Sequence, residues 1–277
     1  MTLSIRPMTP ADLDTAIGWA AAEGWNPGLA DASAFLAEDP GGFLMGWLGD
    51  EPVSSISVVR YGDGFGFLGF YIVTPGWRGQ GHGLATWRAG MDRLEGRVVG
   101  LDGVVAQQDN YRESGFVLAH RNIRYGGTVE VEAPDDPRLT GRLAPQDCAA
   151  LDRILFPAGR GAFLAAWLGA PGHVVRAIAE DGAVTGYGVL RPCREGAKIG
   201  PLFAATEADA DLLFRALAAE APPGPVFLDP PEPNTAAIQL AERRGLVPSF
   251  ETARMYRGPA PELPLNQIFG ITTFELG

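Results

Sequence analysis

The spacing of apolar residues divides the first half of the chain into short strands and helices, and one stretch shows this most clearly. Residues 67–73 form an apolar run rich in aromatic and β-branched side chains, which predicts a buried strand. A Pro/Gly turn follows this run. Apolar residues then recur with helical spacing, at Leu84, Trp87, Met91 and Leu94. Residues 67–95 are therefore predicted to form a strand, a glycine loop and a helix.

The neighbouring segments extend this unit into a mixed fold. Thr9 and Pro10 have the residue types of a helix N-cap and a first helical turn. Apolar runs at 43–48 and 52–59 predict two strands, and a further strand begins at Val98 after the predicted helix. A meander of strands followed by a helix and a parallel strand predicts the α/β class, with a mixed sheet of α+β type.

The loop between the central strand and the helix favours binding of an anion. In the run Arg78-Gly79-Gln80-Gly81-His82-Gly83, several backbone N–H groups lack bulky side chains. These groups lie where the helix macrodipole is positive, which suits a phosphate or a pyrophosphate. A flexible turn without a ligand is the alternative, because the motif is short and the chain contains 37 glycines.

A dinucleotide-binding loop is a second alternative for this motif. Gly81 and Gly83 are followed by a strand that ends at Asp102, near the place of a ribose-binding acid. Two features disfavour this interpretation. Thr86 occupies the position of the third glycine, and residues 74–78 separate the strand from the loop. A dinucleotide-binding fold turns almost at once after its strand.

Composition and charge narrow the classes of partner. The 277 residues suffice for two domains, and the net charge of −11 argues against a nucleic-acid partner. Up to Pro137, nine Arg and no Lys stand against 18 Asp and Glu, so this half carries a net charge of −9. An acidic surface favours a cationic acceptor such as an amine, although it also aids solubility.

Other compositional features predict a cytoplasmic protein without metal. No window has the apolar length of a membrane helix, and the N-terminal sequence lacks the pattern of a signal peptide, so we expect no membrane partner. The three histidines and two cysteines have no metal-ligand spacing. Cys148 and Cys193 are expected to be buried free thiols. The sequence does not indicate an oligomeric state.

The pattern Arg-x-x-Gly-x-Gly between a strand and a helix resembles the acetyl-CoA loop of the GNAT N-acetyltransferases. This resemblance implies that successive backbone amides of the loop hold the pyrophosphate of acetyl-CoA, which is a co-substrate in this family. The residues expected to contact this co-substrate are Ile72, Val73, Arg78, Gly79, Gln80, Gly81, His82, Gly83 and Leu84.

A second motif, at 109–116, resembles the closing motif of the same family, in which a Tyr stands four residues before Gly-Phe. The Tyr of the family lies near the sulfur of CoA and can protonate the leaving thiolate, and the resemblance implies this role for Tyr111. A half-buried packing residue is the alternative. The sequence departs from the family at Val104, where the family often has an Asn that contacts pantetheine.

The acceptor side of the site is less clearly marked. In the resemblance, the loop that carries Glu23 and Trp25 faces the acceptor, so both residues are candidates for contact with an amine. Asp102 is a further candidate, as an amine anchor or a base. For Glu23 and Asp102 a solvated surface carboxylate is the alternative. Residues 69–71 carry no carboxylate at the frequent base position of the family. The base is therefore Glu23, Asp102 or a water relay.

After the acidic, proline-bearing segment 130–137, motifs of the first half recur in the same order. Residues 143–147 repeat 8–12, and Gly245-Leu246 repeats Gly115-Phe116. The chain thus resembles a tandem GNAT subgroup over nearly its whole length. The predicted parts are a GNAT acetyltransferase domain at 1–129, a linker at 130–137 and a second GNAT-like domain at 138–277.

The second copy has lost the features that bind CoA. Residues 206–211 stand where the first copy has its glycine loop, and they contain no glycine and three carboxylates. Carboxylates at the start of a helix complement its dipole and repel a pyrophosphate. Ala241 occupies the position of Tyr111 and cannot donate a proton. We therefore expect a degenerate domain that binds no CoA.

The sequence as a whole predicts an acetyl-CoA-dependent N-acetyltransferase. The resemblance implies a ternary complex in which an amine attacks the thioester directly, without an acyl-enzyme. A backbone N–H near Phe70 or Tyr71 would stabilise the oxyanion. The acceptor class stays open between a small-molecule amine and a peptide amine. The alternatives are a non-catalytic CoA or acyl-CoA sensor and a dinucleotide-binding oxidoreductase.

Overall fold

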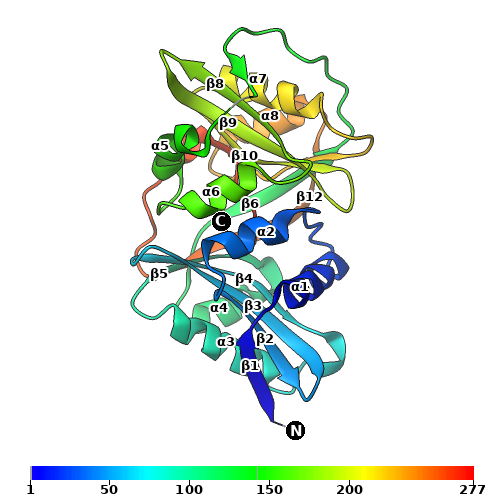
Figure 1. Cartoon of the computed structure of the whole chain (residues 1–277), viewed down its shortest axis with the longest axis vertical. Helices are drawn as coiled ribbons and strands as arrows, with labels where there is room; N and C mark the ends of the chain where they lie inside the picture. Colours follow the sequence, from blue (N-terminus) through cyan, green and yellow to red (C-terminus); the bar gives the residue numbers. More distant parts are fainter. Residues whose placement is uncertain (1, 142) are drawn as a thin grey trace.

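The two halves of the chain fold with the same order of strands and helices (Figure 1). The computed structural model describes residues 2–141 and 143–277. The strands of the first half are β1 (Leu3–Pro7), β2 (Phe43–Leu48), β3 (Glu51–Tyr61), β4 (Phe65–Val73), β5 (Val98–Val104) and β6 (Val117–Gly127). Its α-helices are α1 (Pro10–Ala22), α2 (Asp31–Glu38), α3 (His82–Arg93) and α4 (Gln108–Glu113).

The second half repeats this order after a segment, 128–138, without helix or strand. Its strands are β7 (Leu139–Thr140), β8 (Val174–Glu180), β9 (Ala183–Pro192), β10 (Ala197–Ala204), β11 (Val226–Leu228), β12 (Val247–Arg257) and an additional β13 (Ile268–Gly270). Its α-helices are α5 (Pro145–Leu155), α6 (Gly161–Leu168), α7 (Glu207–Ala218) and α8 (Thr235–Arg243). The predicted mixed α/β fold in two tandem copies is confirmed.

One mixed sheet runs through both halves because their last strands are exchanged. In the described residues the strand order is β1-β2-β3-β4-β5-β12-β6-β11-β10-β9-β8-β7, and β13 pairs with β10. Strand β12 of the second half pairs with β5, with Arg254 opposite Asp102. Strand β6 of the first half pairs with β11, with Gly127 opposite Val226. Each half therefore needs the other to complete its sheet.

Local signals in the sequence explain where the first elements begin. The predicted N-cap at Thr9 is confirmed, since its hydroxyl accepts a hydrogen bond of 3.2 Å from the backbone N–H of Asp12. The carboxylate of Asp12 accepts a hydrogen bond of 2.9 Å from the N–H of Thr9, which completes a capping box. The predicted strands at 43–48 and 52–59 are confirmed as β2 and the greater part of β3.

Alternate side chains of the central strands face two different cores. Val59 and Phe67 belong to the core that lies under α1 and α2. Val58 and Leu68, their neighbours along the strands, belong to the core that lies under α3. This alternation is the period-two pattern of a strand that is covered on both faces.

The core under α1 and α2 is shared with the second half. The ring of Phe35 in α2 stacks on Trp167 of α6 with centroids 6.2 Å apart, and it meets Phe70 of β4 edge-on at 5.9 Å. Residues 271–277 enter the same region and are all buried. The hydroxyl of Tyr61 donates a hydrogen bond of 3.0 Å to the carbonyl of Leu276. The C-terminal segment therefore ends at the centre of the molecule, between the two halves (Figure 1).

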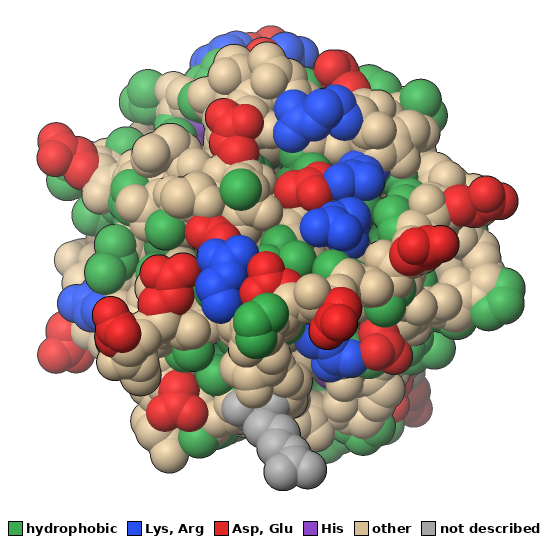
Figure 2. Space-filling view, turned by 90° about the horizontal axis from the view of Figure 1, so that it is seen from above, with side chains coloured by type: hydrophobic (Ala, Val, Ile, Leu, Met, Phe, Trp, Pro, Cys, Tyr) green, Lys and Arg blue, Asp and Glu red, His purple; other side chains and the backbone are tan. Residues whose placement is uncertain are grey.

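The surface of the second half carries charges of both signs. Seen from above, this end of the molecule shows acidic and basic side chains interspersed (Figure 2). Ion pairs such as Arg176–Glu220 and Arg244–Asp211 lie in this half. Most of the excess of acidic residues is in the first half, where nine Arg and no Lys stand against 18 Asp and Glu up to Pro137.

Three further findings concern the described part of the chain. None of the helices in 2–141 and 143–277 combines the length and the apolar character needed to cross a membrane. Within the same residues, no group of three or more His, Cys, Asp and Glu side chains is placed to hold a metal ion. Cys148 and Cys193 are both buried and free, as predicted from their sequence context.

Candidate active site

The site begins where two parallel strands separate. Strands β4 and β5 pair in parallel from Phe65 opposite Val98 to Leu68 opposite Leu101, and the described pairing ends there. Just beyond, β4 bulges. Its pairing with β3 passes from Gly69 opposite Ser57 to Ile72 opposite Ser55, and Phe70 has a φ of 44°. A bulge bends a strand and redirects its backbone groups, so that β4 and β5 open into a cleft.

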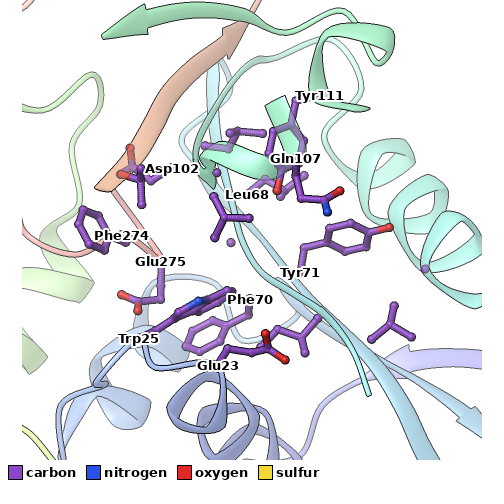
Figure 3. A pocket seen from close by; sticks show the side chains of 18 of the residues that line it. Glu23, Trp25, Leu68, Phe70, Tyr71, Asp102, Gln107, Tyr111, Phe274 and Glu275 are labelled. Atoms are coloured by element: carbon purple, nitrogen blue, oxygen red, sulfur yellow. The ribbon is translucent and has the colours of Figure 1, made fainter. Parts of the chain in front are cut away.

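This cleft is a cavity of about 670 Å³. Figure 3 shows Tyr111 and Tyr71 on one side and Trp25 and Glu275 on the opposite side. Most of the lining comes from the first half, but β12 and the C-terminal segment also contribute. The second-half residues that line the cavity are Phe250, Thr252, Phe274 and Glu275.

The glycine loop forms one wall of the cavity, where α3 begins. Gly79 and Gly81 have φ values of 74° and 86°, a left-handed conformation that favours glycine. Gly81 is the N-cap of α3. Glycine is favoured at position 83 for a different reason, because a Cβ there would lie 2.9 Å from the hydroxyl of Tyr71. The loop thus presents its backbone at a helix N-terminus, which is an anion-binding arrangement.

The structure brings most of the predicted CoA contacts to this wall. The predicted contacts that line the cavity are Ile72, Val73, Arg78, Gly79, Gly81, Gly83 and Leu84. Gln80 and His82 do not line it. The side-chain amide of Gln80 donates a hydrogen bond of 3.0 Å to the carbonyl of Gly76, and the ring of His82 packs edge-on against Trp77 at 5.7 Å.

Tyr111 lines the cavity and is also a packing residue. Its ring stacks on Trp87 of α3 at 5.7 Å, and a Cβ on Gly103 would lie 2.2 Å from it. Burial raises the pKa of Tyr111 above its ordinary value, so the phenol stays protonated at neutral pH. Tyr111 therefore places a protonated hydroxyl in the cavity. Tyr71 is a second phenol in the cavity, and burial raises its pKa as well.

The acceptor-side candidates Glu23 and Trp25 also line the cavity. Glu23 forms an ion pair with Arg78, which joins the end of α1 to the glycine loop. The guanidinium of Arg78 also donates a hydrogen bond of 2.9 Å to the carbonyl of Val73. Trp25 follows Glu23 in the same loop, and its carbonyl accepts a hydrogen bond of 2.9 Å from Arg124 of β6. Both residues thus line the same cavity as the glycine loop.

The expectation of a solvated carboxylate at Asp102 is wrong. The side chain is fully buried and accepts two hydrogen bonds from Arg254, at 2.8 and 2.6 Å, and one from Asn122 at 2.8 Å. Arg254 reaches it because β12 lies directly beside β5. Burial raises the pKa of Asp102, and the charge of Arg254 offsets part of this rise. Asp102 lines the cavity as one member of an ion pair.

The first turn of α7 in the second half is already occupied by its own side chains. The hydroxyl of Thr206 caps the helix by accepting a hydrogen bond of 3.1 Å from the N–H of Asp209. The carboxylate of Asp209 in turn accepts a hydrogen bond of 2.9 Å from Arg138. Ala241, in the position of Tyr111, is buried. This helix start carries negative side chains where the first half presents bare backbone.

Sequence motifs did not identify the second-half residues of the cavity. Phe250 and Thr252 reach it only through the exchange of β12 into the first half. Glu275 has one local signal, since it stands between Phe274 and Leu276 in an otherwise uncharged and largely apolar segment. A lone carboxylate in such a run is either paired or functional.

Comparison with known proteins identifies the family. Residues 11–116 match the model of the acetyltransferase (GNAT) family, and residues 148–270 match a second acetyltransferase (GNAT) domain. The chain is 35% identical over 262 residues to holothin acyltransferase of Pseudoalteromonas sp. (strain SANK 73390), covering 94% of this chain and 89% of that protein. The chain belongs to the GNAT acyltransferase family. This family uses acetyl-CoA or another acyl-CoA.

Solved structures extend the GNAT likeness to the whole fold. A crystal structure from Pyrococcus horikoshii superposes with a TM-score of 0.85 at 22% identity, covering 99% of this chain and 96% of that chain. A tandem GNAT protein from the clavulanic acid biosynthesis pathway superposes with a TM-score of 0.63 at 16% identity, covering 94% of this chain and 100% of that chain. The tandem arrangement of two GNAT copies therefore recurs in another protein.

Proposed function

We propose that the protein transfers an acetyl group from acetyl-CoA to an amine acceptor while both substrates are bound. The observation that carries this proposal is a continuous cavity that joins the glycine loop and Tyr111 to an aromatic and acidic end. Bound at opposite ends of one cavity, an acyl donor and an amine meet without a covalent enzyme intermediate. Neither Cys148 nor Cys193 lines this cavity, which agrees with direct transfer.

The glycine loop supports the position of the donor. With the pyrophosphate on the backbone amides at the start of α3, the pantetheine arm extends between β4 and β5, where these strands no longer pair. The thioester then lies near the bulge at Phe70, and the sulfur lies near Tyr111. We propose one CoA site per chain, because the start of α7 carries carboxylates where α3 carries the loop.

The chemistry follows from this placement. The neutral nitrogen of the amine attacks the carbonyl carbon of the thioester, so that a C–N bond forms and the C–S bond breaks. A backbone N–H at the bulge, at Phe70 or Tyr71, stabilises the negative charge on the carbonyl oxygen. Tyr111 donates its proton to the departing thiolate and recovers the proton that the nitrogen releases. The products are an amide and free CoA.

The acceptor end of the cavity favours a small amine with an apolar body. Its wall is rich in aromatic side chains, namely Trp25, Phe70, Phe250 and Phe274. Carboxylates beside such walls suit a cation that is attached to a ring or to another apolar group. The relative named holothin acyltransferase supports acyl transfer as the reaction. A peptide amine is the other acceptor to include in the test.

A panel assay tests the proposal. The protein is mixed with acetyl-CoA and, in separate reactions, with arylalkylamines, polyamines, aminoglycosides and short peptides, and the released CoA thiol is measured. We expect thiol release with at least one arylalkylamine and an acetylated product of the matching mass. Binding of acetyl-CoA without product from any amine would support the alternative of a CoA sensor. Binding of NADH instead of acetyl-CoA would contradict both.

A further inference from the structure

The C-terminal segment is a fixed part of the core rather than a loose tail. The backbone N–H of Ile271 donates a hydrogen bond of 3.0 Å to the carbonyl of Asp229. Further along, the N–H of Leu276 donates one of 2.9 Å to the hydroxyl of Thr273, and the carbonyl of Leu276 accepts the hydrogen bond from Tyr61. Side chains on this segment therefore have defined positions.

This segment lies directly on β4, beside the bulge. A Cβ added to Gly69 would lie 2.3 Å from the carbonyl oxygen of Glu275 and 3.0 Å from its Cα. Only a glycine allows so close an approach of two backbones. The backbone of Glu275 thus lies next to Gly69, which precedes Phe70. Its side chain lines the cavity opposite Tyr111 (Figure 3). Strand β4 itself has no carboxylate at 69–71.

Glu275 differs from the other two carboxylates of the cavity by its lack of a partner. Asp102 is held by Arg254, and Glu23 is held by Arg78. The side chain of Glu275 makes no hydrogen bond or ion pair with any residue in the described part of the chain, although it is only 3% exposed. A buried and unpaired carboxylate is costly to keep, unless a ligand supplies the missing charge.

Two of the cations near Glu275, Arg124 and Lys198, are engaged with other groups. Arg124 makes two hydrogen bonds of 2.8 Å with Asp229, and Lys198 donates one of 3.0 Å to the carbonyl of Asn26.

Arg191 and Asp31 also act on Glu275, and their side chains lie 3.7 Å apart. The Nε of Arg191 is buried without a hydrogen-bond partner. Burial raises the pKa of the Glu275 carboxyl, and the field of Lys198 and of the two arginines offsets part of the rise. A carboxylate with a raised pKa is a better proton acceptor.

We propose that Glu275 binds the ammonium group of the acceptor and takes one proton from it. This proposal rests on the proposed function, since it concerns the acceptor of the same cavity. In the step, one N–H bond of the ammonium breaks and an O–H bond forms on the carboxylate. The electron pair stays on the nitrogen, which becomes the neutral nucleophile. Glu275 returns the proton to solvent after the products leave. The second half thus supplies a catalytic residue to the first.

The test compares a cation with its neutral isostere. Phenethylamine and 2-phenylethanol differ in their terminal ammonium and hydroxyl groups, and their affinities are measured by NMR titration in the presence of saturating CoA. The wild-type protein is expected to bind the amine about tenfold more tightly, as expected for one charge-assisted hydrogen bond. Glu275→Gln should remove this preference. Glu262→Gln removes a carboxylate charge from an exposed position before the C-terminal segment, and this variant should keep the preference for the amine.

The outcomes separate this proposal from the function on which it rests. Glu275→Gln should bind acetyl-CoA like the wild type and should lose at least tenfold in the turnover of the best amine of the panel. No preference for phenethylamine in the wild type, or an equal preference in Glu275→Gln, overturns the role of Glu275. Failure of the wild type to bind acetyl-CoA overturns the transferase proposal instead.

Discussion

Tyr111 is a packing residue to which we also assign a chemical role. Its ring fills the space left by Gly103 and stacks on Trp87, so the phenol has little freedom to move. The same contacts exclude water and raise its pKa. A phenol with a raised pKa keeps its proton at neutral pH. The two interpretations of this residue from sequence are therefore compatible.

Replacement of Tyr111 by Phe tests the donor role. Tyr111→Phe keeps the ring and removes the hydroxyl, so acetyl-CoA binding should be unchanged while turnover falls by about 10²-fold. Tyr71→Phe removes the other phenol of the cavity and serves as the comparison. Steady-state kinetics on the best amine of the panel decides between them. Wild-type turnover in Tyr111→Phe together with a large loss in Tyr71→Phe would assign the proton transfer to Tyr71.

Gly69 provides a test of how the C-terminal segment is seated. Gly69→Ala would place a methyl group 2.3 Å from the carbonyl oxygen of Glu275, so one of the two backbones must shift. Such overpacking typically costs about 1–3 kcal/mol, and we expect a lower free energy of unfolding in urea. Gly76→Ala is the control, because no heavy atom lies within 4 Å of an added Cβ there. Equal stability of the two variants would mean that the segment does not lie on β4.

Residues in continuous motifs could be found from the sequence, whereas residues brought in from a distance could not. Tyr111 was found because the glycine and aromatic residues that mark it lie within eight positions. Glu275 stands more than 200 positions from β4, and no short pattern connects the two. Gly69 shows the same limit. A side chain is excluded at this position by the backbone of Glu275, which is far away in the sequence.

At the scale of elements, we assign the binding of CoA to the unit of β4, glycine loop and α3. Gly81→Glu places a carboxylate at the N-cap of α3, where it would repel the pyrophosphate. We expect loss of acetyl-CoA binding by calorimetry. Gly96→Glu is the matched control. Both glycines have a left-handed φ, 86° and 77°, and open space around an added Cβ, but Gly96 is not among the residues that line the cavity. Equal affinity of the two variants would contradict the assignment of the loop.

The pairing of elements was predicted less completely than the elements themselves. The strand, loop and helix in 67–95 follow from local periodicity and glycine chemistry, and all three are confirmed as β4, the loop and α3. The exchange of β12 and β6 depends on which of several compatible strands pair across the sheet. A strand pattern gives the faces of a strand but not its neighbour. For this reason the sequence does not identify Arg254 as the partner of Asp102.

At the scale of the whole molecule, the exchanged strands make the halves interdependent. Residues 1–129 and 138–277, produced separately, each lack the strand that pairs with their own β5 or β11. We expect each part alone to be unfolded or aggregated and the two together to form a one-to-one complex that binds acetyl-CoA. Circular dichroism, size-exclusion chromatography and calorimetry check these outcomes. A folded, CoA-binding 1–129 would contradict the dependence on β12.

The most direct test of the central claim is a calorimetric titration of the whole protein with acetyl-CoA. The account places one donor site in the first half and none in the second, so it predicts one molecule of acetyl-CoA bound per chain. Gly81→Glu should abolish the heat of binding and Glu275→Gln should leave it unchanged. Absence of binding, or two equivalent sites per chain, would contradict the claim that the glycine loop of the first half is the acetyl-CoA site.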